Sequence, residues 1–340
     1  MQQAAYSRFD GDDAGNRQGT LPIRGTYAAA PRGDDGSSAE TVMVGTSGGP
    51  AHTGDDKVNG MPTDLLGREY ETFPAPKPLS QHGPARIIAI CNQKGGVGKT
   101  TSSINIAGAL SQYGRRCLIV DFDPQGNATI GCGIASVEET IVKAMMADIN
   151  NSFTPSDLAI IHTDKFDVLP SNIELSNLEL ALVSVIGREG GLKRILEPIK
   201  SNYDYIIIDT LPSLGILTVN SFVASDYVIV PVLAKDYYSL QGFDALLQSV
   251  ELTRRCINPN LKVLGDVITM YDGRNKNDNI ISETIRNDER TETFNTVIPL
   301  STKAAEANRM GKTILQHDPQ GKVATAYREL ADEMLNRMGE

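Results

Sequence analysis

Apolar residues follow two alternating patterns along most of the chain. From residue 85 onward, short and almost continuous apolar runs are separated by longer segments in which apolar positions recur at helical spacing. Such short apolar runs are typical of strands that are buried on both faces of a parallel sheet. The expected strands are residues 86–91, 116–121, 205–209, 227–231, 262–269 and 296–299. The expected helices are residues 100–113, 137–148, 174–186, 190–201, 216–224, 238–256, 278–290 and 320–338.

This alternation predicts a three-layer α/β fold, in which a mainly parallel, twisted β-sheet is flanked by helices. In folds of this kind the ligand binds at the carboxyl ends of the strands. The glycines and polar residues that directly follow the expected strands are therefore the first candidates for function.

The first 84 residues follow neither pattern. They are rich in Gly, Ala, Asp, Ser, Thr and Pro, and their acidic residues outnumber their basic ones. A segment of this composition cannot bury enough apolar surface to offset the entropy of ordering the chain. We therefore expect residues 1–84 to form a disordered N-terminal tail and residues 85–340 to form one folded domain.

Charge and cysteine content narrow the possible partners and the cellular location of the protein. The net charge is −10, so any contact with nucleic acid would need a local basic patch. No apolar run reaches the roughly 18 residues that a membrane span needs, and the N-terminus does not resemble a signal peptide. The four cysteines show no CxxC pairing and no metal-ligand spacing. We expect a cytoplasmic protein with reduced thiols and no membrane association.

A glycine-rich loop joins the first expected strand to the first expected helix. Its sequence, QKGGVGKT, spans residues 93–100. Glycines let backbone N–H groups converge on phosphates, and the helix N-terminus adds the positive end of its dipole. In this arrangement Lys99 reaches the β- and γ-phosphates, and the Thr100 hydroxyl ligates Mg²⁺.

The loop departs from the standard G-x-x-x-x-G-K-[ST] pattern at its entrance. Gln93 stands at the position of the first glycine, and Lys94 adds a second lysine. That lysine is either an ordinary solvated charge or a phosphate ligand that serves the nucleotide of a neighbouring molecule. Spacing alone leaves both readings open. A dinucleotide-binding fold, which Asp121 at the end of the second strand would suit, is excluded because G-x-G-x-x-G is absent.

Three carboxylates stand at or just after the ends of expected strands. Asp121 ends the second strand and Asp123 follows it, within DFDPQGN, and Asp209 ends the third strand, YIIID. Carboxylates at these positions lie on the ligand edge of the sheet. Asp209 has the Walker B layout, in which the carboxylate reaches Mg²⁺. The two earlier acids either complete the site or only cap a loop.

The segment KGGVGKT at residues 94–100 resembles the deviant Walker A signature of the ParA/MinD family of P-loop ATPases. The resemblance implies that Lys94 reaches across a dimer interface to the partner's nucleotide, whereas Lys99 serves its own. Residues 121–127 resemble the family's D-x-D-P-Q-G-N stretch, which implies that Asp123 positions the attacking water. The implied catalytic residues are Lys94, Lys99 and Asp123; the implied phosphate ligands are Lys94, Gly95, Gly96, Val97, Gly98, Lys99, Thr100 and Thr101; and the implied magnesium residues are Thr100, Asp121 and Asp209.

Further segments extend this resemblance. Residues 170–172 (PSN), 210–215 (TLPSLG) and 237–242 (YYSLQG) are similar to family segments. Residues 269–272 (TMYD) resemble the segment close to which the family holds adenine, which implies that Met270 and Tyr271 lie near the base. The matches run from about residue 86 to about residue 335 and look most like bacterial chromosomal ParA-type partition proteins. They imply a P-loop NTPase fold that uses ATP and Mg²⁺.

A guanine-reading N-K-x-D pattern occurs at residues 275–278. Such a motif must stand directly at the end of a strand to reach a base, whereas the fifth expected strand stops near Thr269. We therefore interpret the pattern as a chance match in a polar loop and expect ATP rather than GTP.

The resemblance implies an ATP-dependent, dimerising switch for chromosome or plasmid partitioning. In ParA-type proteins the ATP-bound homodimer binds DNA without sequence preference, and a ParB-type partner stimulates a slow ATP hydrolysis. Such a protein would be cytoplasmic and nucleoid-associated. The basic residues that could meet DNA phosphates are Arg286, Arg290, Lys303, Arg309 and Lys312.

An alternative function stays open at this point. It is a ParA-like positioning or regulatory ATPase that acts through a protein partner without binding DNA. The basic candidates are interleaved with acidic residues, and Leu300 and Lys303 stand where the family often has arginines. MinD-type membrane anchoring is not expected, because residues 322–340 show no basic amphipathic face.

Overall fold

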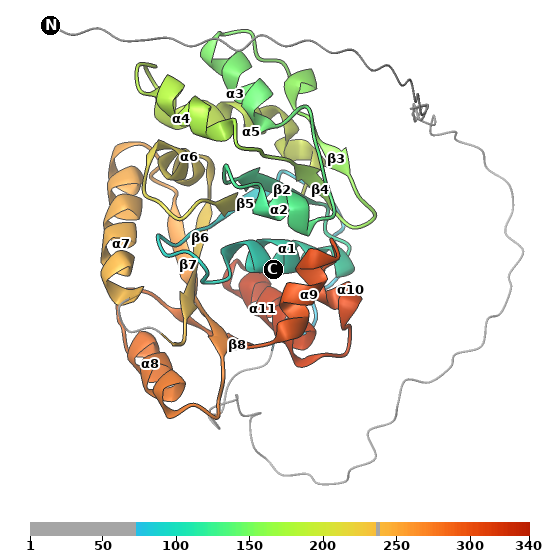
Figure 1. Ribbon diagram of the computed structural model, residues 1–340, viewed down its shortest axis with the longest axis vertical. Coiled ribbons are helices and arrows are strands. Elements are labelled where there is room, and N and C mark those ends of the chain that lie inside the picture. The colour runs from blue at the N-terminus through green and yellow to red at the C-terminus, as the bar shows by residue number, and fades with distance from the viewer. Residues whose placement is uncertain (1–72, 236–238) are drawn as a thin grey trace, which may run out of the picture. The chain divides into compact units, whose positions relative to one another are not determined.

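The computed structural model describes residues 73–235 and 239–340 (Figure 1). Within these residues the centre of the fold is one eight-stranded sheet in the order β3-β4-β2-β5-β1-β6-β7-β8. Neighbouring strands are parallel except for β3 and β4, which are antiparallel. The strands are β1 (Arg86–Ile90), β2 (Cys117–Phe122), β3 (Ile161–His162), β4 (Asp167–Leu169), β5 (Tyr205–Thr210), β6 (Tyr227–Leu233), β7 (Lys262–Tyr271) and β8 (Thr293–Pro299).

The central strands are buried on both faces, as their apolar composition predicts. In β1, β2 and β5, Arg86 is the one residue that is not fully buried. The register places Ile90 of β1 and Asp121 of β2 on either side of Asp209 of β5. The strands therefore bring two carboxylates next to each other at the carboxyl edge of the sheet.

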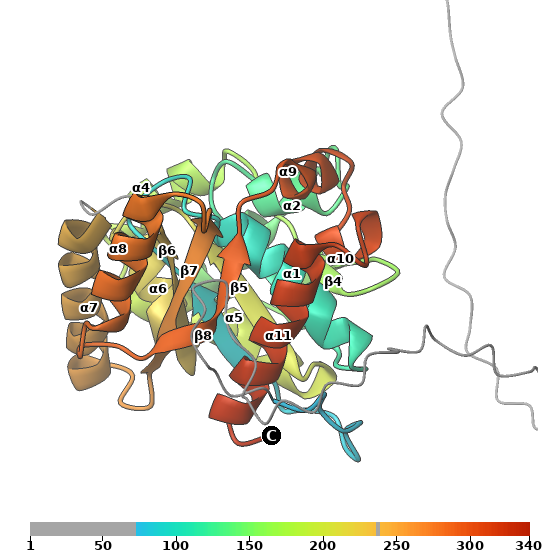
Figure 2. The same ribbon diagram turned by 90° about the horizontal axis from the view of Figure 1, so that it is seen from below.

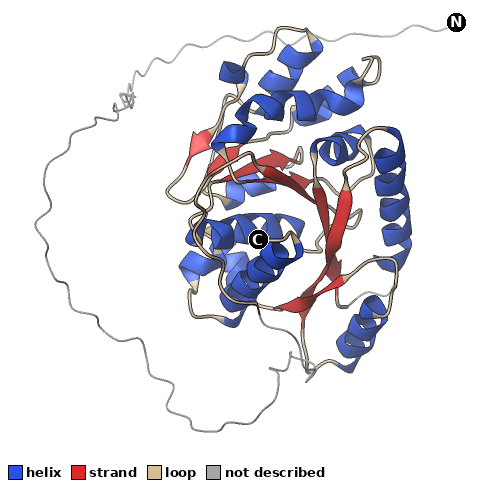
Figure 3. Cartoon of the chain, turned by 180° about the vertical axis from the view of Figure 1, so that it is seen from behind, coloured by secondary structure: helices blue, strands red, loops and turns tan. Residues whose placement is uncertain are grey.

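Helices cover both faces of the sheet (Figures 2 and 3). Helices α1 and α11 pack on one face, with the short α2, α9 and α10 beside them, and α3 to α8 cover the other face. The helices are α1 (Lys99–Gln112), α2 (Asn127–Gly131), α3 (Ile141–Ile149), α4 (Leu175–Leu182), α5 (Gly191–Leu196), α6 (Ile216–Ala224), α7 (Ser239–Cys256), α8 (Lys276–Arg286), α9 (Thr302–Arg309), α10 (Ile314–His317) and α11 (Lys322–Arg337).

The predicted fold class is confirmed, and all six expected strands are present. β7 continues to Tyr271, beyond its predicted end at residue 269, and β8 begins earlier than predicted, at Thr293. The sequence pattern does not predict β3, β4, α2, α9 and α10. These elements are short, so they show too few apolar positions to establish a period.

Residues 73–84 contain no helix or strand, and their last residues lie at the amino ends of the central strands β2 and β5. Asp204 accepts hydrogen bonds from the backbone N–H of Gly83 at 2.8 Å and of Arg116 at 2.7 Å. Nδ1 of His82 lies 2.8 Å from the same carboxylate. The remainder of the predicted tail, residues 1–72, lies outside the described residues, as do residues 236–238 of the YYSLQG segment.

Two further properties bear on the predicted setting. None of the helices in the described part of the chain is both long and apolar enough to cross a membrane. The four cysteines are free thiols; Cys91 and Cys117 are buried, Cys132 is partly buried and Cys256 is exposed.

Candidate nucleotide-binding site

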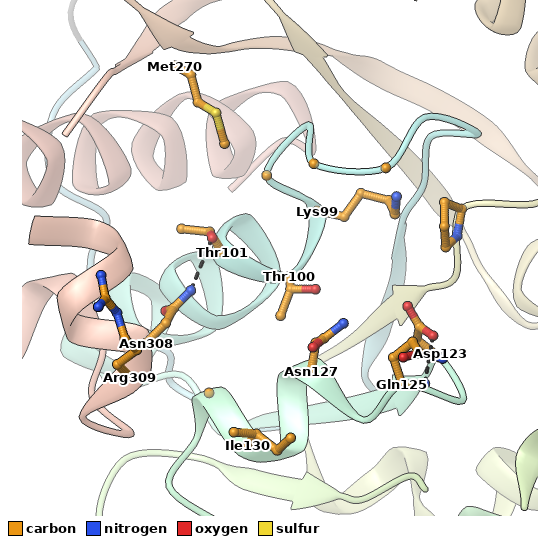
Figure 4. Close-up of a pocket in the computed structure, with 15 residues that line it drawn as sticks. Lys99, Thr100, Thr101, Asp123, Gln125, Asn127, Ile130, Met270, Asn308 and Arg309 are labelled. Atoms are coloured by element: carbon orange, nitrogen blue, oxygen red, sulfur yellow. Dashed lines mark hydrogen bonds between the residues drawn. The ribbon is translucent and has the colours of Figure 1, made fainter. Parts of the chain in front are cut away.

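The loop between β1 and α1 forms an open cradle at the carboxyl edge of the sheet (Figure 4). Gly96 and Gly98 adopt φ angles of 74° and 87°, in the left-handed region that other residues rarely occupy. No atom lies within 4 Å of a Cβ placed on Gly95 or Gly96, so the concave side of the loop is open. Helix α1 begins directly after Gly98, and its free backbone N–H groups point into the cradle.

Lys99 lies within this loop rather than in solvent. Its side chain is 7% exposed, and its ammonium group donates a hydrogen bond to the carbonyl oxygen of Lys94 at 3.0 Å. Burial lowers the pKa of Lys99, and the nearby carboxylate of Asp209 acts in the opposite direction. A partly desolvated ammonium group beside converging N–H groups is well suited to binding phosphate.

Asp209 is a fully buried carboxylate near the end of β5. It accepts hydrogen bonds from the hydroxyl groups of Thr100 at 2.7 Å and Ser103 at 2.9 Å. Burial raises the pKa of Asp209 to about 7, and repulsion from Asp121 adds to the rise. A carboxylate in this environment is strongly stabilised by a nearby cation.

Asp121 lies beside Asp209 and is held by helix α2. Its carboxylate accepts hydrogen bonds from the backbone N–H and the hydroxyl of Thr129, both at 2.7 Å. Burial raises the pKa of Asp121 to about 6, although these hydrogen bonds oppose the rise. Thr129 is a positioning residue that the sequence analysis does not identify, because no motif marks it.

Asp123 follows β2 and forms part of the pocket wall. It is 6% exposed, and its Oδ1 accepts a hydrogen bond from the backbone N–H of Gln125 at 2.9 Å. Figure 4 shows Asp123 at the end of the pocket where Lys99 also lies. The carboxylate is therefore held beside the place that the terminal phosphate of a bound nucleotide would occupy.

The pocket that these side chains line has a volume of about 490 Å³, which is typical of small-molecule sites. A smaller, largely apolar pocket of about 160 Å³ adjoins it at Met270. A phosphate cradle next to an apolar pocket fits a nucleotide, because the first pocket suits phosphates and the second suits a base.

The oxygen ligands of the site fit a magnesium ion that binds together with phosphates. Mg²⁺ usually keeps several waters and takes only one or two carboxylates from the protein. Thr100 supplies a hydroxyl group, and Asp209 and Asp121 supply carboxylates nearby. Across residues 73–235 and 239–340, no group of three or more His, Cys, Asp or Glu is arranged to hold a metal ion.

The two residues expected near the base occupy different places. Met270 has a φ angle of 53° and lines both pockets. Tyr271 is 2% exposed, its hydroxyl bonds to Asn279 of α8, and it lines neither pocket. The structure therefore brings Met270 to the site and places Tyr271 in the packing between β7 and α8.

Lys94 contributes to the site in a different way from Lys99. Its backbone N–H donates to the side chain of Asn92 at 2.9 Å, and its carbonyl oxygen accepts the hydrogen bond from Lys99. Its side chain is half-buried and does not line the pocket that Lys99 lines. The backbone of Lys94 thus belongs to the site of its own chain, whereas its side chain lies outside that pocket.

Three of the basic residues considered for DNA binding lie in or just after α9. Lys303, Arg309 and Lys312 are exposed. Lys303 forms an ion pair with Asp318 at 2.8 Å. Arg309 lines the edge of the nucleotide pocket (Figure 4). Of these three residues, Arg309 lines the pocket, whereas Lys303 and Lys312 line neither of the two pockets described above.

The other two basic candidates are engaged in packing α8. Arg286 donates hydrogen bonds to the carbonyl oxygens of Phe294 and Asn295 in β8, both at 3.0 Å. The guanidinium of Arg290 lies 5.7 Å from the centre of the Phe243 ring and pairs with two neighbouring aspartates. These contacts join α8 and the following loop to the sheet and to α7.

The N-K-x-D segment opens helix α8 and lies in neither pocket. Asn275 caps the helix by accepting a hydrogen bond from the backbone N–H of Asn277 at 3.0 Å. Asp278 is fully buried and accepts one from the backbone N–H of Asp272 at 3.0 Å. Both side chains that would read a guanine are used within the fold, in agreement with a chance match.

The structure adds residues to the site that the sequence analysis does not single out. Ile130 of α2, Pro212 after β5 and Asn308 of α9 line the larger pocket. Pro212 lies within the TLPSLG segment, which the resemblance had marked. No local signal marks Asn308, which reaches the site because α9 packs beside α2 and the Asn308 amide donates to the hydroxyl of Thr101 in α1.

The parallel sheet, the glycine-rich loop that opens α1 and the buried acids of β2 and β5 define a P-loop nucleotide hydrolase. The AAA domain family matches residues 85–263 of this chain. The sporulation initiation inhibitor protein Soj of Bacillus subtilis is 43% identical over 251 residues, which cover 73% of this chain and 98% of Soj. The chromosome partitioning protein ParA of Myxococcus xanthus is 38% identical over 256 residues, which cover 74% of this chain and 88% of that protein.

A solved structure is also similar to this chain in fold and sequence. A structure described as cobyrinic acid a,c-diamide synthase from Mycobacterium smegmatis, with bound ADP and magnesium, has a TM-score of 0.65 and 32% sequence identity. The match covers 75% of this chain and 95% of that chain. The chain belongs to the ParA/Soj family of P-loop ATPases, and the family resemblance predicted from its sequence is confirmed.

Proposed function

We propose that this protein is an ATP-dependent switch for chromosome or plasmid partitioning that dimerises when it binds ATP. The observation that carries the proposal is the different placement of the two loop lysines. Lys99 lies at the phosphate cradle of its own chain, whereas the side chain of Lys94 lies outside that pocket. A second lysine at the entrance of a phosphate site suits the nucleotide of a second copy. The similarity to a chromosome partitioning protein supports the cellular role.

Each residue of the site has a role in this proposal. Lys99 and the backbone N–H groups of residues 95–101 hold the phosphates of ATP. Thr100 and Asp209 hold Mg²⁺, with Asp121 close behind, and Mg²⁺ neutralises the charge that develops on the transferred phosphoryl group. Asp123 orients the attacking water. A 32% identical structure with a bound ATP analogue and magnesium supports this choice of nucleotide and metal.

The proposed DNA contacts lie on α9 and the turn that follows it. Gly311 in this turn packs closely against Gly133 after α2, and the backbone N–H of Ile314 donates to the Asn105 side chain of α1 at 2.7 Å. The segment is therefore fastened to two elements that surround the nucleotide. We expect the ATP-bound dimer to present two such segments to DNA phosphates. The residues concerned are Lys303, Arg309 and Lys312, with Arg286 as a more distant candidate.

A ParB-type protein is the proposed stimulator of the slow hydrolysis. Hydrolysis in each site would remove the γ-phosphates that the dimer shares, and the dimer would then separate and leave the DNA. The protein would be cytoplasmic and nucleoid-associated while it holds ATP. The stimulating partner can be identified by capture with an Asp123→Ala variant. Proteins captured by the ATP-loaded variant are compared with those captured by the ADP-loaded variant.

Binding to DNA of arbitrary sequence tests the proposal. With a slowly hydrolysed ATP analogue we expect binding that weakens steeply as salt rises, because counterions are released from DNA. Lys303→Ala and Lys312→Ala should each reduce the salt slope by about 1. The matched control is Lys262→Ala. Lys262 is exposed at the start of β7, at the amino ends of the strands and away from the carboxyl ends that carry the site. ATP-loaded protein that ignores DNA even at low salt contradicts partitioning through DNA.

The charge distribution favours a second candidate function. The net charge is −10, Lys303 is paired with Asp318, and Arg286 is engaged with backbone carbonyls. These features suit a ParA-like positioning or regulatory ATPase that acts through a protein partner without binding DNA. Absence of DNA binding together with intact ATP-dependent dimerisation would select this function.

A further inference from the structure

Helices α2 and α9 pack side by side, and the turns that follow them meet (Figures 2 and 4). The second residue after each helix is a glycine in the left-handed region, Gly133 with a φ angle of 86° and Gly311 with one of 63°. The backbone N–H of Gly133 donates to the carbonyl oxygen of Ile130 at 2.9 Å, and that of Gly311 donates to the carbonyl oxygen of Asn308 at 3.1 Å. Both helices therefore end in the same kind of glycine turn.

The two glycines pack backbone against backbone. A Cβ on Gly311 would lie 2.3 Å from the Cα of Gly133 and 2.8 Å from its nitrogen. A Cβ on Gly133 would lie 3.3 Å from the carbonyl oxygen of Gly311. Backbone atoms cannot turn aside as the end of a flexible side chain can, so a side chain at position 311 must push the two turns apart.

The turn after α2 is connected to a carboxylate of the magnesium site through one residue, Thr129. The carbonyl oxygen of Thr129 accepts hydrogen bonds from the backbone N–H groups of Cys132 at 3.3 Å and Ile134 at 3.2 Å, on either side of Gly133. The backbone N–H and the hydroxyl of Thr129 donate to Asp121, both at 2.7 Å. A displacement of this turn therefore reaches the carboxylate of Asp121 directly.

The turn after α9 is fixed to α1 by contacts of its own. Nδ2 of Asn308 donates a hydrogen bond to Oγ1 of Thr101 at 3.2 Å, and the backbone N–H of Ile314 donates to the side chain of Asn105 at 2.7 Å. Helix α1 begins at the phosphate loop. The turn that contains Gly311 is thus a fixed support on which the end of α2 rests.

We propose that Gly133 and Gly311 are positioning residues for the magnesium site. Their contact holds α2 in place, and α2 holds the carboxylate of Asp121 through Thr129. The inference rests on the proposed site for Mg²⁺ and ATP, and it goes beyond that site because it assigns a role to a contact outside the pocket. Coupling between two sites is reciprocal, so a partner that binds the basic residues on either side of Gly311 would change the affinity for Mg²⁺ and ATP.

The competing role of Gly311 is purely structural, in which its turn ends α9 and stabilises the fold. Gly114, in the turn after α1, provides the matched control. Its φ angle is 75°, its backbone N–H donates to the carbonyl oxygen of Ser111 at 3.0 Å, and no atom lies within 4 Å of a Cβ placed on it. Gly114→Ala therefore carries the same kind of backbone strain as Gly311→Ala without displacing a neighbour.

The experiment measures by titration calorimetry how tightly each variant binds a slowly hydrolysed ATP analogue, with Mg²⁺ and with EDTA in its place. A displaced Asp121 weakens only the binding that depends on Mg²⁺, whereas a loosened fold weakens both. We expect Gly311→Ala to match the wild type in EDTA and to lose about three- to tenfold of the gain in affinity that Mg²⁺ provides, which corresponds to about one hydrogen bond. Gly114→Ala should have a lower Tm but keep the wild-type gain.

Hydrogen exchange provides a readout that needs neither metal nor nucleotide. In the nucleotide-free protein, the backbone N–H groups of residues 127–134 should exchange faster in Gly311→Ala than in the wild type, because α2 has lost its support. They should exchange at the wild-type rate in Gly114→Ala. Gly133→Ala, whose Cβ makes a milder contact, should show both changes to a smaller extent, and it tests the same contact if Gly311→Ala does not fold.

Two results would overturn the inference. One is an unchanged Mg²⁺-dependent gain in Gly311→Ala, and the other is unchanged exchange of residues 127–134 in that variant. If the wild type binds the analogue neither with Mg²⁺ nor in EDTA, the proposed function itself fails, so the two failures are distinguishable.

Discussion

At the scale of single residues, the buried carboxylate of Asp209 lowers the stability of the nucleotide-free protein when it is charged. Burial raises its pKa to about 7 from the ordinary value of 3.8. Because the pKa is higher in the folded than in the unfolded state, folding is favoured when Asp209 is protonated. That contribution is fully present below about pH 4 and is lost as the pH rises through about 7.

We predict that Asp209→Asn is more stable than the wild type at pH 8 without nucleotide. The amide removes the cost of a buried charge and keeps an oxygen for the hydroxyl groups of Thr100 and Ser103. The expected gain is on the order of 2 kcal/mol, or a rise of several degrees in Tm, and it should shrink toward pH 5. Thermal unfolding across this pH range measures it. A variant that is less stable than the wild type at pH 8 would contradict the raised pKa.

A second prediction at this scale concerns the attacking water. Asp123→Ala should still bind ATP and dimerise, but it should lose turnover by about 100-fold or more, because the carboxylate that is proposed to orient the water is removed. Asp164→Ala, at an exposed aspartate between β3 and β4, is the matched control. The measurement is phosphate release with and without a stimulating partner. Turnover that equals the wild type would refute the role of Asp123.

The sequence allows some residues of the site to be predicted and hides others. Lys99, Thr100, Asp121, Asp123 and Asp209 could be predicted because each stands at or just after the carboxyl end of a strand or within the loop motif. Thr129 and Asn308 could not, since their contacts with Asp121 and Thr101 arise only when α2 and α9 pack against the sheet and α1. Residues that act through tertiary contacts leave no local signal.

At the scale of elements, predictability follows length and burial. The strands β1, β2, β5 and β6 are almost wholly buried, so their apolar runs stand out in the sequence. β3 has two residues, and its His162 is exposed. Helices α2 and α10 have five and four residues. None of these three elements is long enough to show a period, although α2 holds Asp121 and α10 contacts α1.

The environments of the basic residues predict effects on stability that differ in size. Arg286→Ala leaves two carbonyl oxygens of β8 without their donor and should cost about 1–3 kcal/mol. Lys303→Ala removes a surface ion pair and should change stability by less than about 0.5 kcal/mol. Urea unfolding compares the two variants. If Arg286→Ala is as stable as the wild type, the arginine does not hold α8 against β8.

At the scale of the whole molecule, the proposed switch has a nucleotide site that one copy of the chain cannot complete. One chain supplies the cradle, the magnesium ligands and Asp123, and the proposed partner supplies the ammonium group of Lys94. ATP would then control assembly, and hydrolysis would limit how long the dimer lasts. The slow reaction would act as a timer rather than as a source of product.

The mass of the ATP-bound protein in solution, measured by light scattering, tests this claim most directly. In an Asp123→Ala background, where turnover is blocked, we expect a monomer with ADP and a dimer with ATP. Adding Lys94→Ala should leave nucleotide binding in place and return the ATP complex to a monomer, whereas Lys262→Ala should remain dimeric. An ATP-bound dimer that forms normally without Lys94 would contradict the account.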